Sequence, residues 1–179
     1  MRNGQVTRML ATVAVALALT AGVAQAADPP DTWITMKTQV ALMTTEGVST
    51  THLNVDTVKG VVTLHGTVPN DTSKTKAEEV AKGIDGVKSV KNLLQVVPKS
   101  ERSVVERADD EIKKGVEDAF KNNIAVHDSG IKVASVNKGV VLLSGKTTSI
   151  AAHLQAVKLA DAIKGVKRVA TEVEVVPAT

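Results

Sequence analysis

Four histidines are the residues whose side chains most readily suggest metal binding or acid–base chemistry. No two of them are spaced as a metal-binding pair such as His-x-x-x-His, and the chain has no cysteine to complete a zinc site. Two of the four have no histidine counterpart in the internal repeat described below, since His65 aligns with Ser144 and His153 with Lys74. We therefore interpret all four as solvated surface residues and expect no metal: His52, His65, His127 and His153.

A run of three carboxylates, Asp109-Asp110-Glu111, resembles the paired acids of a hydrolase. Consecutive residues of a helix point about 100° apart, so these groups cannot share one substrate atom, and a solvated helix face is the better interpretation. The chain also has no Gly-x-Ser-x-Gly nucleophile motif, dinucleotide fingerprint or phosphate-binding loop. We expect no catalytic residue, no cofactor and no small-molecule substrate, and therefore no enzyme.

A third candidate is a basic helical segment in the second half of the chain. Its lysines could approach anionic headgroups while an aromatic side chain inserts, which predicts lipid-binding residues at Lys113, Lys114, Phe120 and Lys121. The alternative is an ordinary solvated face, because Phe120 also fits the apolar stripe of the helix and the acids at 117–118 dilute the charge. Trp33 likewise has two interpretations, as a packing residue or as a contact with a membrane or partner.

The overall charge argues against nucleic-acid binding. The 179 residues include 22 Lys and Arg against 19 Asp and Glu, but two of the arginines lie in the first 26 residues, which contain no acid. Without them the balance is 20 against 19, and the whole chain has one Trp and one Phe. The chain has neither the excess of Lys and Arg that would neutralise phosphates nor the aromatic residues that would stack on bases. We therefore expect no nucleic-acid partner.

Residues 1–26 have the three parts of a secretory signal peptide. Arg2 and Arg8 precede an apolar run from Met9 to Ala21, and Ala24-Gln25-Ala26 supplies the small residues of a cleavage site. The run of 13 residues is shorter than the roughly 20 that a membrane-spanning helix needs. We expect cleavage after Ala26 and, because no cysteine is present, an exported protein without a lipid anchor.

The remaining sequence is an internal duplication. The segment at 60–98 aligns without a gap with 139–177, an offset of 79, and 15 of the 39 aligned positions are identical. Upstream of these segments the offset becomes 78, which pairs Ile34 with Ile112. The second copy therefore has one extra residue, which we expect in the turn before Gly139.

Each copy has the pattern helix–strand–strand–helix–strand. In the first copy, Asp31 is expected to cap a helix with a buried side of Ile34, Ala41 and Leu42. In the second, Ser103 and Glu106 have the spacing of a capping box, and apolar residues from Val105 to Phe120 follow at helical spacing. Val-rich runs joined by short Gly-containing turns predict hairpins, and the last strands are expected at 87–97 and 166–176.

These elements predict an α+β fold made of two tandem α-β-β-α-β units. The crossover helix between the second and third strands requires a mixed sheet, so each unit should hold a small three-stranded mixed sheet with helices packed on one face. We expect the units at 31–98 and 104–177, joined by a short linker at 99–103.

The repeated motif Gly-Val-Val-x-Leu-x-Gly, followed by a helix and Gly-Val-x-x-Val, resembles the BON domain. It stands at Gly60–Gly66 with Gly86, Val87 and Val90, and again at Gly139–Gly145 with Gly165, Val166 and Val169. The resemblance implies a non-enzymatic periplasmic protein, associated with osmotic stress, that contacts anionic phospholipid surfaces or envelope proteins. The alternative is a chaperone-like holdase for exported or outer-membrane proteins.

Overall fold

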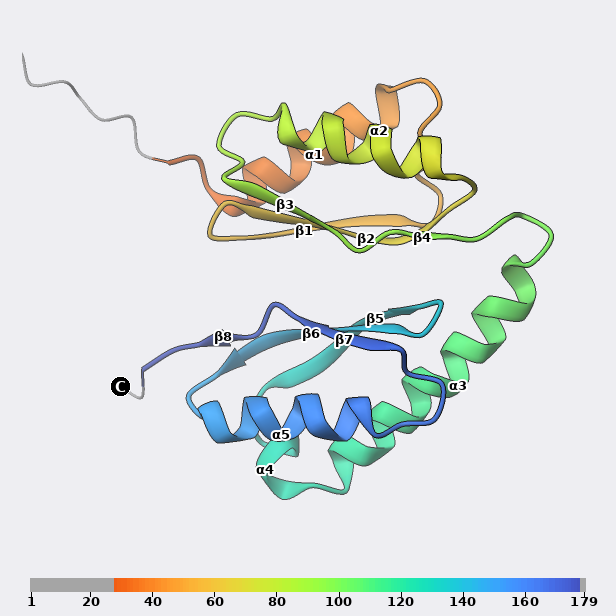
Figure 1. Cartoon of the computed structure of the whole chain (residues 1–179). Coiled ribbons are helices and arrows are strands. Elements are labelled where there is room, and N and C mark those ends of the chain that lie inside the picture. Colours follow the sequence, from red (N-terminus) through yellow and green to blue (C-terminus); the bar gives the residue numbers. More distant parts are fainter. Residues whose placement is uncertain (1–27, 178–179) are drawn as a thin grey trace, which may run out of the picture.

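The computed structural model describes residues 28–177, and the leader predicted at 1–26 lies outside this range. The described residues form two units of the same element order, each with its own hydrophobic core (Figure 1). In both units the helices cover one face of a small sheet of mixed strand direction. The predicted α+β class and the two tandem units are thereby confirmed.

The sheet of the first unit is built around β2 (Val61–Val68). The strand β1 (Leu53–Val58) pairs with it in the antiparallel direction. On the other side the predicted last strand is divided into β3 (Ser89–Asn92) and β4 (Gln95–Val96), and both pieces run parallel to β2. The parallel pairing is possible because the intervening helix carries the chain back to the start of β2.

Two helices cover this sheet, α1 (Asp31–Thr44) and α2 (Asp71–Lys82). The buried side of α1 consists of Ile34, Thr38 and Leu42. Thr38 thus takes the place that the sequence assigned to Ala41, and its hydroxyl is satisfied by donating to the Ile34 carbonyl at 2.8 Å. A threonine can replace an alanine in the core here because its own helix accepts its only donor.

The second unit repeats this order with a longer first helix. Its α3 begins at Arg102, with no side-chain cap, so the expected capping box does not form: Ser103 already lies inside the helix. A short helix that the sequence did not predict follows, with the Asn123 side chain accepting from the Val126 amide. The elements are α3 (Arg102–Lys121), α4 (Ile124–His127), β5 (Ile131–Asn137), β6 (Val140–Thr147), α5 (Ile150–Asp161), β7 (Arg168–Thr171) and β8 (Glu174–Val175).

A carboxylate at the first helix of each unit holds the hairpin turn. The turn residues Lys59 and Gly60 have φ values of 53° and 78°, the left-handed conformations of a type I′ turn. The Asp31 carboxylate accepts their backbone N–H groups at 2.7 and 2.8 Å. Asp31 is therefore a clamp on the turn, while the helix cap position belongs to Pro30.

The second unit uses the same device in a more buried setting. Asp109 accepts the N–H groups of Lys138 and Gly139 at 2.7 and 2.9 Å, and its side chain is only 8% exposed. The expectation that Asp109 lies on a solvated face is wrong, because the extended α3 brings this turn of the helix against the hairpin. Its neighbours Asp110 and Glu111 are exposed as expected.

The extra residue of the second unit lies within a strand. The register of β5 on β6 shifts between Val133 and Ser135, which leaves Ala134 as a β-bulge. The turn that follows still has two residues, Lys138 and Gly139, as in the first unit. The prediction that the turn before Gly139 is longer is therefore wrong: the hairpin keeps its turn, which Asp109 clamps, and absorbs the extra residue upstream.

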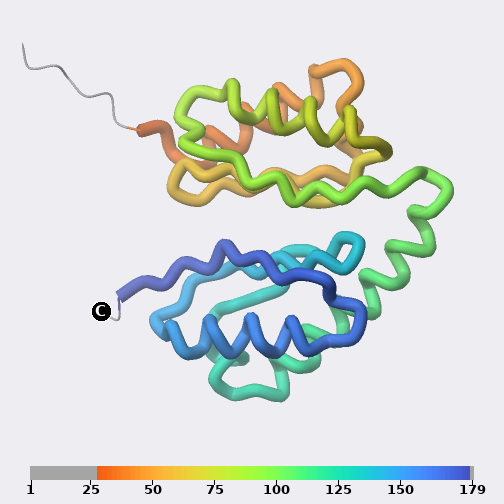
Figure 2. Tube along the Cα trace, viewed as in Figure 1, coloured from red at the N-terminus to blue at the C-terminus, as the bar shows by residue number. Residues whose placement is uncertain are grey.

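The two units pack with their sheets facing each other and their helices outermost (Figures 1 and 2). Alternate residues of β2 explain how both faces are covered. Val62, Leu64 and Val68 belong to the first core, whereas Thr63, His65 and Thr67 point the other way and are also buried. Contact between β2 and β5 closes this second face, so β2 is covered on both sides as a central strand of a larger protein would be.

Candidate functional site

The lysines expected to bind lipid lie on the surface of α3. Lys113 and Lys114 are exposed in the middle of the helix, and Lys121 is exposed in its last turn, 3.9 Å from the carboxylate of Asp118. Phe120 is 6% exposed and packs in the second core. The structure therefore brings the lysines to the surface of one helix, whereas the aromatic ring of the same helix is buried in the core.

The histidines do not come together. Three of them each have a polar neighbour: His52 is 3.8 Å from Glu106 of the second unit, His127 is 2.7 Å from Asp128, and His153 is 2.8 Å from the Thr171 hydroxyl. No group of three or more metal-binding side chains is found within residues 28–177. His65 differs from the expectation of a surface histidine, because it is only 6% exposed.

His65 is buried because its strand face meets the second unit. Its Nε2 lies 2.9 Å from the Asp56 carboxylate, while its Nδ1 is buried with no hydrogen-bond partner among the described residues. Because both groups lie where the two sheets face each other, we interpret the His65–Asp56 pair as part of the polar packing between the units.

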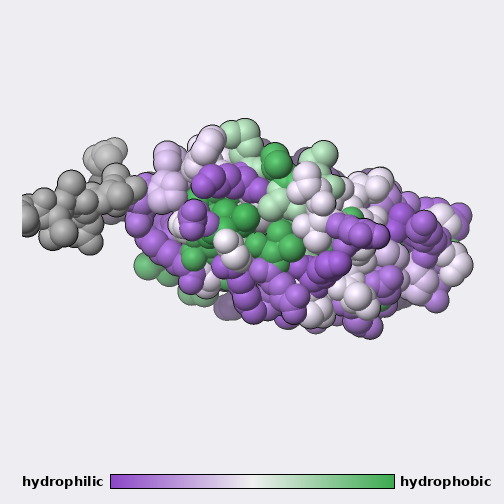
Figure 3. Space-filling model, turned by 90° about the horizontal axis from the view of Figure 1, so that it is seen from above, coloured by the Kyte–Doolittle hydropathy of each residue, from purple (hydrophilic) through white to green (hydrophobic). Residues whose placement is uncertain are grey.

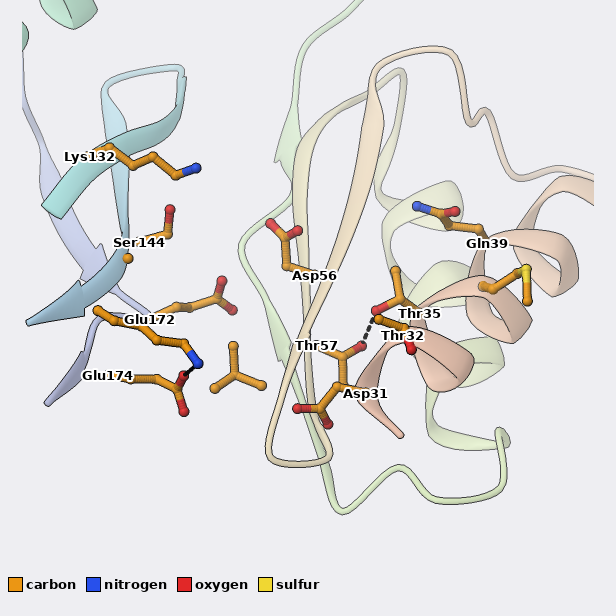
Figure 4. Close-up of a pocket in the computed structure, with 14 residues that line it drawn as sticks. Asp31, Thr32, Thr35, Gln39, Asp56, Thr57, Lys132, Ser144, Glu172 and Glu174 are labelled. Carbon is orange, nitrogen blue, oxygen red and sulfur yellow. Dashed lines mark hydrogen bonds and ion pairs between the residues drawn. The ribbon is translucent and has the colours of Figure 1, made fainter. Parts of the chain in front are cut away.

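A cleft of about 570 Å³ opens at one edge of this packing (Figure 4). The first unit contributes residues of α1 and β1 to its wall, and the second contributes residues of β5, β6 and the β7–β8 segment. Charged side chains of both signs face the space from the two sides: Asp56 from the first unit, and Lys132, Glu172 and Glu174 from the second.

The carboxylates of this region are held in different electrostatic states. The hydrogen bond from His65 lowers the pKa of Asp56, and the positive charge of Lys132 contributes in the same direction. Burial raises the pKa of Glu172, and the nearby negative charge of Asp56 adds to the effect. Glu174 bridges the units, 3.1 Å from the Lys146 ammonium and 3.2 Å from that of Lys59, and these partners lower its pKa. The arrangement thus joins two units through polar contacts.

A second surface feature lies on the outer side of α1. Four large apolar side chains are exposed there, and we call them the α1 stripe: Trp33 (46% exposed), Met36 (51%), Val40 (56%) and Met43 (71%). Figure 3 shows apolar side chains gathered on this helical face of the first unit. Trp33 is thus half-exposed on this face. The spacing of three, four and three residues between these side chains was visible in the sequence. The inward residues of the same helix are also mostly apolar, so the sequence did not show which side of the helix would be exposed.

None of the helices within residues 28–177 combines the length and the apolar character required to cross a membrane.

The sequence model of the BON domain family matches the chain twice, at residues 30–98 and 108–177. The chain is similar to the osmotically-inducible protein Y of Escherichia coli (strain K12), with 34% identity over 145 residues, or 80% of this chain and 72% of that protein. It is also similar to the outer membrane lipoprotein DolP of Haemophilus influenzae, with 35% identity over 117 residues, which cover 65% of this chain and 59% of the lipoprotein.

Among solved structures, CdsD, a structural protein of the type III secretion system of Chlamydia trachomatis, aligns over 80% of this chain and 92% of its own. The identity is 13% and the TM-score is 0.33.

Proposed function

Because this chain belongs to the BON domain family and carries two copies of the domain, we propose that it is a non-enzymatic, stress-associated binding protein of the cell envelope that contacts phospholipid surfaces or envelope proteins. The observation that carries the proposal is the similarity over 80% of the chain to a protein named for its osmotic induction. The similarity to an outer membrane lipoprotein supports the envelope as the place of action.

The proposed location is the periplasm. The leader at 1–26 has the parts of a signal peptide, and the sequence contains no cysteine to which a lipid anchor is normally attached. In this proposal the chain reaches membranes by reversible contact, unlike a lipoprotein that is held there covalently.

The surface proposed for the first contact with headgroups is that of Lys113, Lys114 and Lys121 on α3. All three are exposed, and a basic residue near an anionic membrane gains about 1 kcal/mol from its surface potential. Phe120 was expected to insert beside them, but its ring is enclosed in the core. In the proposal the three lysines therefore act through charge, and the binding they provide is sensitive to salt.

Flotation with vesicles tests the proposal. The chain without its leader should float with phosphatidylglycerol-containing vesicles at low salt and less at high salt. Lys113→Glu/Lys114→Glu/Lys121→Glu should weaken flotation, while a variant with the same charge change at exposed lysines elsewhere, Lys82→Glu/Lys91→Glu/Lys99→Glu, should retain most of it. Absence of flotation with both anionic and zwitterionic vesicles would refute lipid contact.

A holdase for exported proteins is the second candidate, and exposed apolar side chains favour it. Besides the α1 stripe, Ile124 is 82% exposed, Ile150 65% and Leu154 59%, the last two one turn apart on α5. Large apolar residues at a surface commonly mark interaction sites. Holdase action should suppress the aggregation of an unfolded client in the absence of lipid, at near-stoichiometric ratios. Unchanged light scattering of the client would exclude this candidate.

A further inference from the structure

The methionines beyond the predicted leader are gathered on one helical face. The sequence has four methionines and no cysteine, and the two methionines that follow the leader are Met36 and Met43, both in α1. They are seven residues apart, about two helical turns, so both belong to the α1 stripe. They are 51% and 71% exposed, and the hydrophobic cores within residues 28–177 contain no methionine. Both sulfur-containing residues that the structure describes are therefore at the surface.

The packing of the fold does not require methionine at these two positions. Methionine is among the residues most often buried, because its flexible, polarisable side chain fills irregular gaps in a core. Here that role belongs to Val, Leu, Ile, Ala and one Phe. At the offset of 78 between the two copies, the counterparts of Met36 and Met43 are Lys114 and Lys121, which are exposed on α3. The same helix of the same fold thus accepts strongly polar side chains at both positions.

We propose that Met36 and Met43 are a reversible oxidation site, at which peroxide or hypochlorous acid converts the α1 stripe from an apolar to a polar surface while the fold stays intact. Each thioether sulfur gives up two electrons and takes one oxygen atom. With peroxide the O–O bond breaks and water leaves, and with hypochlorous acid chloride and a proton leave. A dithiol-dependent methionine sulfoxide reductase reverses the step: the oxygen leaves as water and the dithiol becomes a disulfide. The inference goes beyond the proposed function, since it concerns a modification and no partner.

The position of the two side chains lets an oxidant reach them in the folded state. The helix α1 belongs to the outer layer of the molecule (Figure 1), and Met43 lies in its last turn. Met36 lies one turn after Trp33 and lines both the cleft between the units and a shallow hollow formed with Pro29 and Pro30. Because oxidation follows exposure, we expect Met43 to react faster than Met36.

Sulfoxides at these positions change the surface of the first unit and leave its core as it is. A methionine sulfoxide is polar, so in a core it would bury a polar group among apolar ones and destabilise the fold. Here the new S=O groups point to solvent, while the inward residues of α1 are untouched. Along the helix, Met36 lies between Trp33 and Val40, and Met43 follows Val40. Oxidation therefore interrupts the apolar stripe at two points.

Oxidation of the folded chain by hydrogen peroxide, followed by intact mass spectrometry, tests the site. The chain without its leader should gain about 32 Da, about 16 Da for each sulfur, at no less than about a third of the rate of the same chain unfolded in urea. In Leu64→Met a third methionine takes a core position that is 0% exposed, and it should be oxidised at least about tenfold more slowly than the other two. If the folded chain gains oxygen at one methionine or none while the unfolded chain gains two, the inference is wrong.

Hydrophobic-interaction chromatography of the folded chain measures the change of its surface. The oxidised chain should elute earlier, at a higher ammonium sulfate concentration, and its urea midpoint should equal that of the untreated chain. Two methionine sulfoxide reductases, one for each sulfoxide epimer, should restore the mass and the elution together when supplied with a dithiol. Met36→Leu/Met43→Leu should elute near the untreated chain both before and after peroxide. Met36→Gln/Met43→Gln, which places polar groups of similar size at the same positions, should elute near the oxidised chain without any treatment.

Three further results would overturn the inference. A lower urea midpoint after oxidation would show that the reaction damages the fold. Failure of the reductases to remove the oxygen from the folded product would show that the modification is not reversible. An elution shift in peroxide-treated Met36→Leu/Met43→Leu as large as that of the original chain would assign the change of surface to another residue, such as Trp33. These results leave the proposed function untouched, because vesicle flotation and client aggregation test it separately.

Discussion

The clamp between the first helix and the hairpin turn can be tested with one substitution in each unit. In Asp109→Asn an amide that donates replaces one of the two oxygens that accept the Lys138 and Gly139 N–H groups, at 2.7 and 2.9 Å. One of the two hydrogen bonds is lost, and the other keeps its acceptor oxygen, which no longer belongs to a charged group. Because hydrogen bonds to charged groups contribute about 1.5–3 kcal/mol, we expect the free energy of unfolding to fall by about 2–3 kcal/mol.

The matched variant is Asp31→Asn, which removes the same clamp from the first unit. Its bonds have similar lengths, 2.7 and 2.8 Å, but the side chain is more exposed than that of Asp109. Water can replace a lost partner there, so the expected loss is smaller, about 1 kcal/mol.

Urea denaturation followed by far-UV circular dichroism would measure both losses, and Trp33 fluorescence would report the first unit separately. The slope of the unfolding free energy against urea concentration should be unchanged, since the surface exposed on unfolding is the same. If Asp31→Asn costs more than Asp109→Asn, or if both cost less than about 0.5 kcal/mol, the clamp does not stabilise the hairpin as inferred.

Further predictions concern two glycine positions and the carboxyl group of Glu172. Gly145 has a φ of +124°, and a Cβ added there would meet the carbonyl oxygen of Gly130. We therefore expect Gly145→Ala to lower the free energy of unfolding, measured by urea denaturation, by more than about 3 kcal/mol. Gly83→Ala, at an ordinary φ of −81° with its nearest contact at 3.5 Å, should change stability by less than about 0.5 kcal/mol. Burial raises the pKa of Glu172, so its stabilising contribution is full when the group is protonated and is lost as the pH rises through the raised pKa. Glu172→Gln should therefore increase the urea midpoint at pH 7.5, and the difference should disappear below about pH 4; a larger difference at acidic pH would contradict this sign.

Local periodicity was sufficient to predict the main elements and their order, but not the short α4 or the division of each last strand into two. Period-two Val-rich runs, helical spacing and Gly-containing turns are all encoded within a few residues of one another, and the duplication allowed each unit to support the assignment of the other. The same locality explains the errors. Deciding between a bulge at Ala134 and a longer turn requires the register of two strands, which the alignment of the copies does not contain.

The candidate sites were less predictable because they depend on what covers each face. Lys113, Lys114 and Lys121 were found at the surface, but whether Phe120 joins them is decided by the packing of α3 on its sheet. Asp109 was assigned to solvent because its contact lies 29 and 30 residues away. The α1 stripe could have been suspected by comparing outward positions of the two copies, where apolar residues in one align with charges in the other.

The sequence by itself therefore determined that the chain is an α+β repeat, because helical and strand periodicities and an in-register duplication are encoded in the sequence itself. Its charge and aromatic content also predict that the chain has no nucleic-acid partner. Only the tertiary structure decided that His65 is enclosed between two sheets and that the outer side of α1 is exposed. Burial is a property of contacts between distant segments, and the same apolar spacing on α1 would suit a covered or an open face equally well.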